Sequence, residues 1–284
     1  MTEQYALEEL IDNYQNKDLI KAKVIIDHLV ILGKTEQQKI LFALNKWEDD
    51  FALPVLVYLF HKRPDVVRSN DKLHSAITEK AAANPSILLK NLVKIEPETY
   101  KYVELVGVTK LRAAIPRLRQ FLTGTSDQKL VIESIRCLGK LKDRQSVEPI
   151  GEYLLSTELD LQNTVVQALC IIGDDKAIAL LSKAIELKGE KASVVLNLAS
   201  EIKNSTALEV LNYALNSSDT LIRNKAKAAL IESGVDSIPF VSKNLSRKDA
   251  DLLVHSLNIL QEISDEASVK AVRQFVDTSP EGSN

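Results

Sequence analysis

The sequence is poor in aromatic side chains and in the residues that make tight turns. Its 284 residues include nine Gly and eight Pro, only 5% are aromatic, and there is a single Trp. So few turn residues leave little room for a β-rich fold with many chain reversals. Hydrophobic residues still make up 45% of the chain and charged residues 26%, which is ordinary for a folded protein. Because Leu, Ala, Lys and Glu favour helices, the composition predicts an all-α protein.

Cysteine and long apolar stretches are also scarce. Cys137 and Cys170 are the only cysteines and no Cys-x-x-Cys occurs, so we expect two buried, unreactive thiols in a reducing compartment. No apolar run reaches the roughly 18 residues of a membrane span. The start, MTEQYALEELIDNY, lacks the basic residues and apolar core of a signal peptide. The sequence therefore predicts a cytoplasmic protein that does not enter the membrane.

An excess of positive charge is missing as well. The net charge is −3, and this acidic balance makes nucleic acid an unlikely partner, because phosphate binding needs a basic surface. The net charge of the whole chain conceals a basic segment in its middle, because residues 62–144 carry 17 Lys+Arg against 9 Asp+Glu. Residues 1–61 carry 6 against 10, and residues 145–284 carry 13 against 20. This segment is either an ordinary solvated surface or a zone where an acidic partner docks.

Signatures of catalysis are absent too. The four histidines, His28, His61, His74 and His255, show no metal-ligand spacing, and no His-Glu dipeptide occurs. No Gly-x-Ser-x-Gly, phosphate-binding loop or dinucleotide fingerprint appears. Pairs of carboxylates such as Asp174–Asp175 have the character of helix caps and turn residues. We therefore expect a protein that is not an enzyme and needs neither a metal nor a cofactor.

What the sequence does contain is a repeat of about 30 residues. Val147, Ile178 and Leu208 each open a run with apolar residues three and four positions apart, the pattern of an amphipathic helix. Ile115, Ile238 and Val269 open further copies. Polar turns, STELD, LKGEK, NSSDT and LSRKD, separate each first helix from a second one.

The second helices end in a shared pattern. Leu138, Leu169, Ala199 and Leu260 occupy one apolar position, and the next residue is Gly139, Cys170, Ser200 or Gln261. The first three of these are small, which would let a neighbouring helix approach closely. Gln261 departs from the rule, as end repeats commonly do where their outer face meets water.

Two units in particular, AIPRLRQFLTGTSDQKLVIESIRCLGKLKD and SIPFVSKNLSRKDADLLVHSLNILQEISD, resemble short bacterial HEAT repeats like those of phycobilin lyases. Ile222–Arg223 matches the Val-Arg pair of that pattern and Cys137–Leu138–Gly139 its Ala-Leu-Gly, whereas Val131 and Gln162 stand where the Arg would be. The resemblance implies an α-solenoid of antiparallel helix pairs. It covers residues 113–276. Helical periodicity alone predicts divergent copies of the same helix pairs in 1–112, with a separate helical cap as the alternative, and the small polar residues at 277–284 predict a disordered tail.

In a solenoid the second helices usually line a concave surface, so we predict a non-catalytic scaffold that binds another protein there. Periodicity places the following polar residues on that surface: Lys129, Glu133, Arg136, Gln162, Gln167, Arg223 and Lys227. Two alternatives stay open. The resemblance suggests a phycobilin-lyase-like chromophore lyase or chaperone, and the basic segment 62–144 could bind nucleic acid. Deoxyhypusine hydroxylase, which also has HEAT-type repeats, needs paired His-Glu motifs that this sequence lacks.

Overall fold

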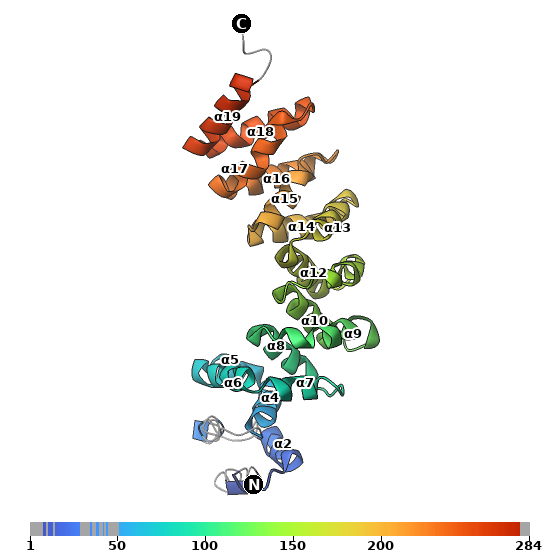
Figure 1. The fold of residues 1–284 in the computed structure, drawn as a ribbon, viewed down its shortest axis with the longest axis vertical. Coiled ribbons are helices and arrows are strands. Elements are labelled where there is room, and N and C mark those ends of the chain that lie inside the picture. The colour runs from blue at the N-terminus through green and yellow to red at the C-terminus, as the bar shows by residue number, and fades with distance from the viewer. Residues whose placement is uncertain are drawn as a thin grey trace. The chain divides into compact units, whose positions relative to one another are not determined.

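All regular elements in the described part of the chain are helices. The computed structural model describes residues 51–278 and 15–28, together with residues 8, 9, 11–13, 35, 38, 39, 42 and 44. No strand occurs among these residues, which confirms the predicted all-α solenoid. The helices form two compact units, residues 1–137 and 138–284 (Figure 1). The predicted division of the chain after residue 112 stays a prediction.

Several helices of unit 1 begin at a proline or an Asn cap. Pro64, Pro85 and Pro116 lie in the first turn of their helices, where a missing N–H costs nothing. Asn70 Oδ1 accepts a hydrogen bond from the backbone N–H of Leu73, 3.1 Å away. The helices are α2 (Leu19–His28), α4 (Ala52–Lys62), α5 (Pro64–Arg68), α6 (Asp71–Ala83), α7 (Pro85–Asn91), α8 (Thr99–Thr109), α9 (Ile115–Gly124) and α10 (Gln128–Lys140), and the last crosses into unit 2.

Unit 2 repeats one arrangement of two helices. The first helices are α11 (Val147–Gly151), which continues as the 3₁₀ turn η3 (Glu152–Leu155), then α13 (Asp175–Glu186), α15 (Ser205–Ala214), α17 (Ile238–Val241), which continues as η5 (Ser242–Ser246), and α19 (Glu266–Thr278). The second helices are α12 (Leu159–Ile172), α14 (Gly189–Ile202), α16 (Thr220–Glu232) and α18 (Ala250–Ile263). The structure thus confirms the predicted pairing of helices in this unit.

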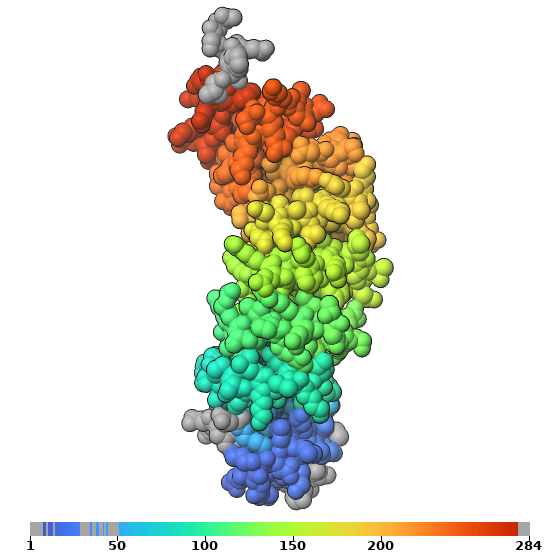
Figure 2. Space-filling model, turned by 45° about the vertical axis from the view of Figure 1, so that its right-hand side comes forward, coloured from blue at the N-terminus to red at the C-terminus, as the bar shows by residue number. Residues whose placement is uncertain are grey.

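The helices of unit 2 pack in two parallel rows. First helices contact the next first helix, as in α11 with α13 and α13 with α15, and second helices contact the next second helix, as in α12 with α14 and α14 with α16. Figure 2 shows these repeats as successive layers of colour from green to red. Each repeat therefore packs mainly on its neighbours in sequence.

The recurring apolar positions form the core between the rows. Leu138, Leu169 and Ala199 have no exposed surface, and Leu260 is 1% exposed. The small residue that follows allows the expected close approach at Gly139, where an added Cβ would lie 2.8 Å from Cα of Ala168. Gln261 is exposed, as its polarity predicted.

Four of the second helices end in a left-handed residue followed by a polar one. Lys142, Gly173, Lys203 and Ser264 occupy the same repeat position, with φ of 52°, 64°, 51° and 52°. Asp174 and Asn204 come next in their repeats, and their side chains accept hydrogen bonds from Ala177 N and Ala207 N, each 2.9 Å long. These contacts satisfy backbone groups at both helix ends.

At the C-terminus, α19 includes Asp277 and Thr278, which the prediction had assigned to a disordered tail. Residues 279–284 of that tail lie outside the described residues, as does most of the predicted helical stretch between residues 29 and 50. Of the helices that the structure describes, none combines the length and the hydrophobicity that crossing a bilayer requires.

Candidate functional site

Two of the predicted partner-binding residues brace turns between paired helices. Gln162 Nε2 donates a hydrogen bond to the carbonyl of Ser156, and Arg223 Nη1 donates one of 2.6 Å to the carbonyl of Ser217. The two side chains occupy equivalent repeat positions, and each carbonyl lies six residues before its donor. The exposure predicted for Gln162 is wrong, because its amide turns inward to this carbonyl and the residue is only 9% exposed. Arg223 is half-buried for the same reason.

The three predicted residues on α10 differ in exposure. Lys129 is exposed, Glu133 is only 6% exposed, and the guanidinium of Arg136 pairs with the Glu133 carboxylate one helical turn away. The prediction that Glu133 is exposed is therefore wrong. Periodicity gives the direction of a side chain but not its coverage, and a carboxylate can be buried here because an arginine compensates its charge.

The remaining two predicted residues lie on the second helices of unit 2. Gln167 on α12 is exposed, and Lys227 on α16 is half-buried. The seven residues thus do not form one surface within either unit, since three belong to α10 in unit 1 and four to unit 2. A role in partner binding stays a prediction for each of them.

A row of three aromatic rings, Tyr58, His61 and Tyr100, forms a cluster in unit 1 that the sequence did not predict. The ring centroids of Tyr58 and His61 are 6.1 Å apart, and those of His61 and Tyr100 are 5.6 Å apart. Lysines flank the row, with Lys62 Nζ 5.2 Å from the Tyr58 centroid and Lys129 Nζ 6.0 Å from the Tyr100 centroid. The rings lie on α4 and α8, and the flanking Lys129 lies on α10, so no sequence period could reveal the cluster.

Acidic side chains neutralise much of the positive charge around this aromatic row. Lys62 pairs with Asp27 at 3.0 Å, Lys101 pairs with Glu104 at 2.7 Å, and Lys23 pairs with Glu98. Of these three pairs, only Lys62–Asp27 brings a carboxylate from outside the segment 62–144, and Lys23–Glu98 in turn uses a carboxylate of the segment, so the pairs leave its excess of positive charge unchanged. Since phosphate binding depends on uncompensated cations, nucleic acid stays an alternative partner for this segment.

His61 stands out within the row because its Nδ1 is buried without a hydrogen-bond partner. Burial lowers the pKa of this imidazole below its ordinary value of 6.5, and Lys62, Lys129 and Lys101 lower it further, against an opposing effect of Glu98. The surroundings of the ring therefore favour its neutral form.

The most exposed apolar group in unit 2 lies at a turn. We call Leu155, Leu159 and Leu187 the leucine edge, and they are 61%, 58% and 54% exposed. All three line one groove of about 590 Å³ between η3, the start of α12 and the end of α13. Lys191 Nζ donates a 2.9 Å hydrogen bond to the Leu155 carbonyl and so fixes one wall. Gln162, the turn brace described above, also lines this groove.

Two further grooves continue from the leucine edge. Lys188 lines both the first groove and a second one of about 300 Å³, and Glu186 and Tyr213 connect the second with a third of about 470 Å³. Tyr213 is 40% exposed, and its hydroxyl donates to the Glu186 carboxylate. The sequence analysis did not predict this surface, because it treated STELD and LKGEK as polar turns. The one leucine in each of these turns could have indicated an exposed apolar surface.

The chain offers little reactive chemistry where it is described. Cys137 and Cys170 are each 1% exposed, and burial raises the pKa of the Cys170 thiol to about 12. Burial of both cysteines confirms their predicted placement, and their lack of reactivity stays a prediction. Across residues 15–28 and 51–278, no three metal-ligating side chains come together.

Comparison with known proteins supports the fold. Residues 115–199 match the family model for HEAT repeats, which confirms the predicted resemblance over this part of the chain. The structure is similar to that of an engineered protein, with a TM-score of 0.52 and 17% identity, covering 99% of this chain and 85% of that one. At this identity the likeness shows the fold alone. No curated protein matches the sequence.

Two solved structures of enzymes match with lower TM-scores. The CpcE–CpcF complex of phycocyanin lyase from Nostoc sp. PCC7120 has a TM-score of 0.38 at 17% identity, covering 85% of this chain and 94% of that one. Human deoxyhypusine hydroxylase has a TM-score of 0.28 at 13% identity, covering 93% of each chain. Neither likeness is close enough to assign an activity to this chain.

Proposed function

We propose that this protein is a non-catalytic scaffold that binds another protein, and that the leucine edge is its main anchoring surface. The observation that supports this most is the exposure of Leu155, Leu159 and Leu187 around one groove in an array whose other leucines are mostly buried. Contiguous exposed apolar side chains with a polar rim are typical of protein-binding sites. Here the rim consists of Lys188, Glu190 and Lys191.

The energetic reason is the removal of leucine surface from water. Burying apolar surface contributes about 25 cal/mol per Å², and a leucine that goes from exposed to buried contributes roughly 1.5–3 kcal/mol. The groove would hold an apolar side chain of the partner, and Lys188 and Glu190 would fix its orientation by charge. This surface lies at the turns, whereas the sequence had pointed to the exposed face of the second helices.

Affinity capture tests the proposal. The full chain carrying Leu155→Ser, Leu159→Ser and Leu187→Ser should lose specific proteins that the wild type captures from its own cells, measured by quantitative mass spectrometry. The control carries Val93→Ser, Leu221→Ser and Val235→Ser, which remove side chains that are 73%, 62% and 54% exposed elsewhere. The control should retain the same proteins. Identical capture by all three chains would refute the leucine edge as the anchor.

An acidic partner and a cytoplasmic location belong to the same proposal. Lys129 is the best position at which to test whether the positive charge of segment 62–144 attracts a partner. Its side chain is exposed, whereas that of Arg136 pairs with Glu133. Once a partner is captured, Lys129→Glu should slow its association and flatten the dependence of the on-rate on salt, without altering helix content. An unchanged on-rate and salt dependence would show that the segment 62–144 is only a solvated surface.

A further inference from the structure

The third groove, between α13 and α15, carries an excess of negative charge. Its volume is about 470 Å³, and its charged lining residues are Asp175, Lys183 and Glu186 on α13 and Glu209 on α15. Three carboxylates therefore face one lysine, and we call this groove the acidic groove. Asp175 and Glu209 form no ion pair within the described part of the chain, so their charge is not compensated there.

The charges next to the acidic groove do not cancel this excess. Lys176 pairs with Glu148 on the preceding first helix, at 2.6 Å. Lys188 lines the adjoining second groove, and even with this lysine included the carboxylates of the two grooves outnumber their lysines by three to two. Residues 138–284 as a whole carry 16 Lys+Arg against 21 Asp+Glu, so the unit around the groove is acidic as well.

Ser182 adds a buried hydroxyl without a partner to the same groove. The residue lines the groove and is 6% exposed, and its Oγ makes no hydrogen bond to the described chain. A buried hydroxyl normally has a partner, because an unpaired one loses its bonds to water without replacement. Rotation about the Cα–Cβ bond can turn this hydroxyl toward the groove. The groove thus combines uncompensated carboxylates with an unsatisfied polar atom.

Tyr213 gives the groove an aromatic wall. Its side chain is 40% exposed, and its hydroxyl donates a hydrogen bond to Oε1 of Glu186, which holds the ring in place. The other oxygen of that carboxylate, Oε2, is available to a ligand. A planar cation that lies on the ring could therefore donate to the carboxylate beside it.

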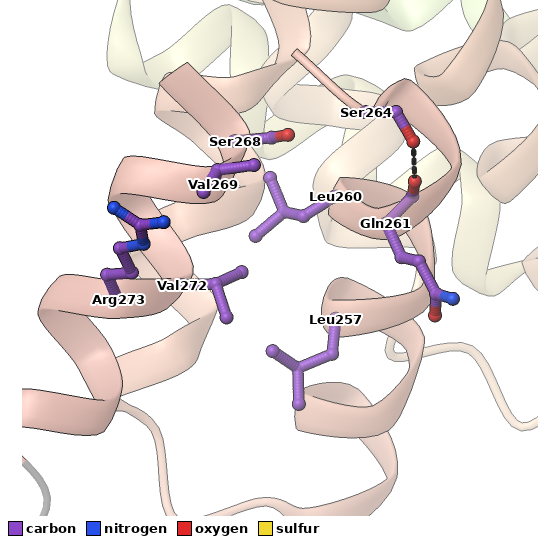
Figure 3. A pocket seen from close by; sticks show the side chains of 8 residues that line it. All are labelled: Leu257, Leu260, Gln261, Ser264, Ser268, Val269, Val272 and Arg273. Carbon is purple, nitrogen blue, oxygen red and sulfur yellow. Dashed lines mark hydrogen bonds between the residues drawn. The ribbon is translucent and has the colours of Figure 1, made fainter. Parts of the chain in front are cut away.

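The groove between α18 and α19 lacks the carboxylates of the acidic groove. Leu257 and Leu260 point toward Val269 and Val272 there, and Arg273 is the only charged residue among those described as lining it (Figure 3). This groove offers nothing that attracts a cation. It therefore provides an internal control for nonspecific binding of a cation to grooves of unit 2.

We infer that the acidic groove binds an arginine side chain of the partner protein. An excess of carboxylates selects a cation, and an organic cation suits the groove better than a metal ion, because no three metal-ligating side chains come together in the described chain. Arginine suits it better than lysine, because a planar guanidinium stacks on a tyrosine ring and has five N–H donors for Glu209, Glu186 and the Ser182 hydroxyl.

The inference rests on the proposed function, because the arginine belongs to a protein that the leucine edge anchors. The second groove joins the two surfaces, since it shares Lys188 with the groove of the leucine edge and shares Glu186 and Tyr213 with the acidic groove. A partner that is acidic where it meets the segment 62–144 can carry this arginine elsewhere on its surface.

An NMR titration of the full chain with N-acetylarginine amide tests the site directly. Amide signals of α13 and α15 should shift with a dissociation constant on the order of 1 mM, as expected for so small a ligand. N-acetylcitrulline amide has the same shape without the charge and should cause no saturable shift, and signals of α18 and α19 should stay in place. Shifts that both compounds cause, or that appear equally at α18 and α19, would overturn the inference.

Two double variants locate the binding. Asp175→Asn with Glu209→Gln should raise the dissociation constant of N-acetylarginine amide at least about threefold, because two carboxylates lose their charge. The matched control, Asp251→Asn with Glu201→Gln, changes the net charge equally at two exposed residues, and Asp251 lies in the first turn of α18 as Asp175 does in α13. The control should bind like the wild type. Equal weakening in both would reveal a general effect of charge and no site.

Ser182→Ala and Ser242→Ala separate ligand binding from stability. Ser242 occupies the equivalent repeat position, and its Oγ is also buried without a partner, but it does not line the acidic groove. Both variants should keep or raise the melting temperature, because each removes an unpaired hydroxyl. Only Ser182→Ala should bind N-acetylarginine amide more weakly, by about twofold or more. Equal binding by the two variants would contradict the role given to this hydroxyl and with it the inference.

The chain with the three leucine-edge substitutions distinguishes this inference from the proposed function. It should bind N-acetylarginine amide like the wild type, because none of the three leucines lines the acidic groove. Asp175→Asn with Glu209→Gln should in turn weaken capture of the proteins that the leucine edge retains. Capture that needs the leucine edge but not these two carboxylates would refute the inference alone. Binding of N-acetylarginine amide together with capture that ignores the leucine edge would refute the proposed function and leave the arginine site standing.

Discussion

At the scale of single residues, one missing side chain sets how closely α12 approaches the last turn of α10, the part of that helix that belongs to unit 2. A Cβ added at Gly139 would lie 2.8 Å from Cα and 2.9 Å from Cβ of Ala168, so α10 and α12 touch almost backbone to backbone. The obstacle is main chain, which cannot rotate away as the end of a long side chain could. Glycine is therefore required there by packing, against its poor helix propensity.

Gly139→Ala should destabilise the protein although alanine is the better helix former. The gain in propensity is about 1 kcal/mol, and overpacking typically costs 1–3 kcal/mol, so we expect a net loss of about 1 kcal/mol. Gly124→Ala at the end of α9 is the matched control, because nothing lies within 4 Å of its added Cβ. Thermal unfolding followed by circular dichroism measures both. Equal or higher stability of Gly139→Ala would contradict the close approach.

His61 gives a prediction of pH dependence at the same scale. Its pKa is lowered in the folded state, mainly by burial, so the unfolded chain takes up a proton first as the pH falls below 6.5. The stability that this group contributes is therefore complete above pH 6.5 and declines as the pH falls through its folded pKa. His61→Phe keeps a ring beside Tyr58 and Tyr100 but cannot titrate, so it should lose less stability than the wild type between pH 7.5 and 5.5.

Direct titration provides the check on that mechanism. In an NMR titration of the native protein, the imidazole of His61 should have a pKa below 6.5, as its burial and its lysine neighbours require. A pKa above 6.5, or the same pH dependence of stability in wild type and His61→Phe, would be incompatible with the burial described for this ring.

At the scale of helices, Asn204 joins two repeats through a single side chain. Its Oδ1 caps α15 by accepting from Ala207 N, and its Nδ2 donates to the carbonyl of Cys170 near the end of α12, each at 2.9 Å. Asp174 occupies the equivalent position and caps α13 through its Oδ1. Only the amide can cap one helix and also donate to the neighbouring one, because an ionised carboxylate has no proton to donate.

Substitutions at Asn204 should separate these two contributions. Asn204→Asp keeps the cap but loses the bond to Cys170, which should cost about 1 kcal/mol. Asn204→Ala loses both and should cost about 2 kcal/mol, whereas Asp174→Ala, which removes the cap of α13, should cost about 1 kcal/mol. Urea unfolding provides the comparison. If Asn204→Asp were as stable as the wild type, the amide would add nothing to the junction between the repeats.

The sequence predicted the helices of unit 2 well because their apolar residues recur at fixed positions. Val147, Leu208 and Ile238 opened the expected first helices and are buried as expected. Exposure of polar residues was harder to predict, as Glu133 and Gln162 show, because a hydrogen bond or an ion pair can draw a side chain inward. The leucine edge and the aromatic row were missed because turns and contacts between several helices have no period.

At the scale of the whole molecule, each repeat is stabilised mainly by its neighbours. In unit 2, α18 packs against α16, α17, η5 and α19, and α12 packs against α11, η3, α13 and α14. A destabilising substitution at one end of this unit should therefore lower the local stability of the adjacent repeats most. This behaviour is expected of quasi-one-dimensional arrays, in which stability is a sum over repeats and their interfaces.

Ile259→Ala tests that locality. Ile259 on α18 has no exposed surface, and truncating a buried isoleucine to alanine typically costs 2–5 kcal/mol. Hydrogen exchange read by mass spectrometry should quicken in α16 to α19 and change little in α11 to α13. Uniformly faster exchange across unit 2 would instead show that its repeats unfold as one cooperative block.

The left-handed residues that end the repeats also bear on how this chain could be engineered. Three of the four, Lys142, Lys203 and Ser264, carry a side chain in a conformation that generally costs a non-glycine residue about 1 kcal/mol or more. Gly173 shows that the same turn accepts glycine. Replacing the three strained residues by glycine could therefore stabilise the protein at equivalent positions along the array. A thermostable version could be built by regularising these turns alone, leaving the core and the exposed surfaces as they are.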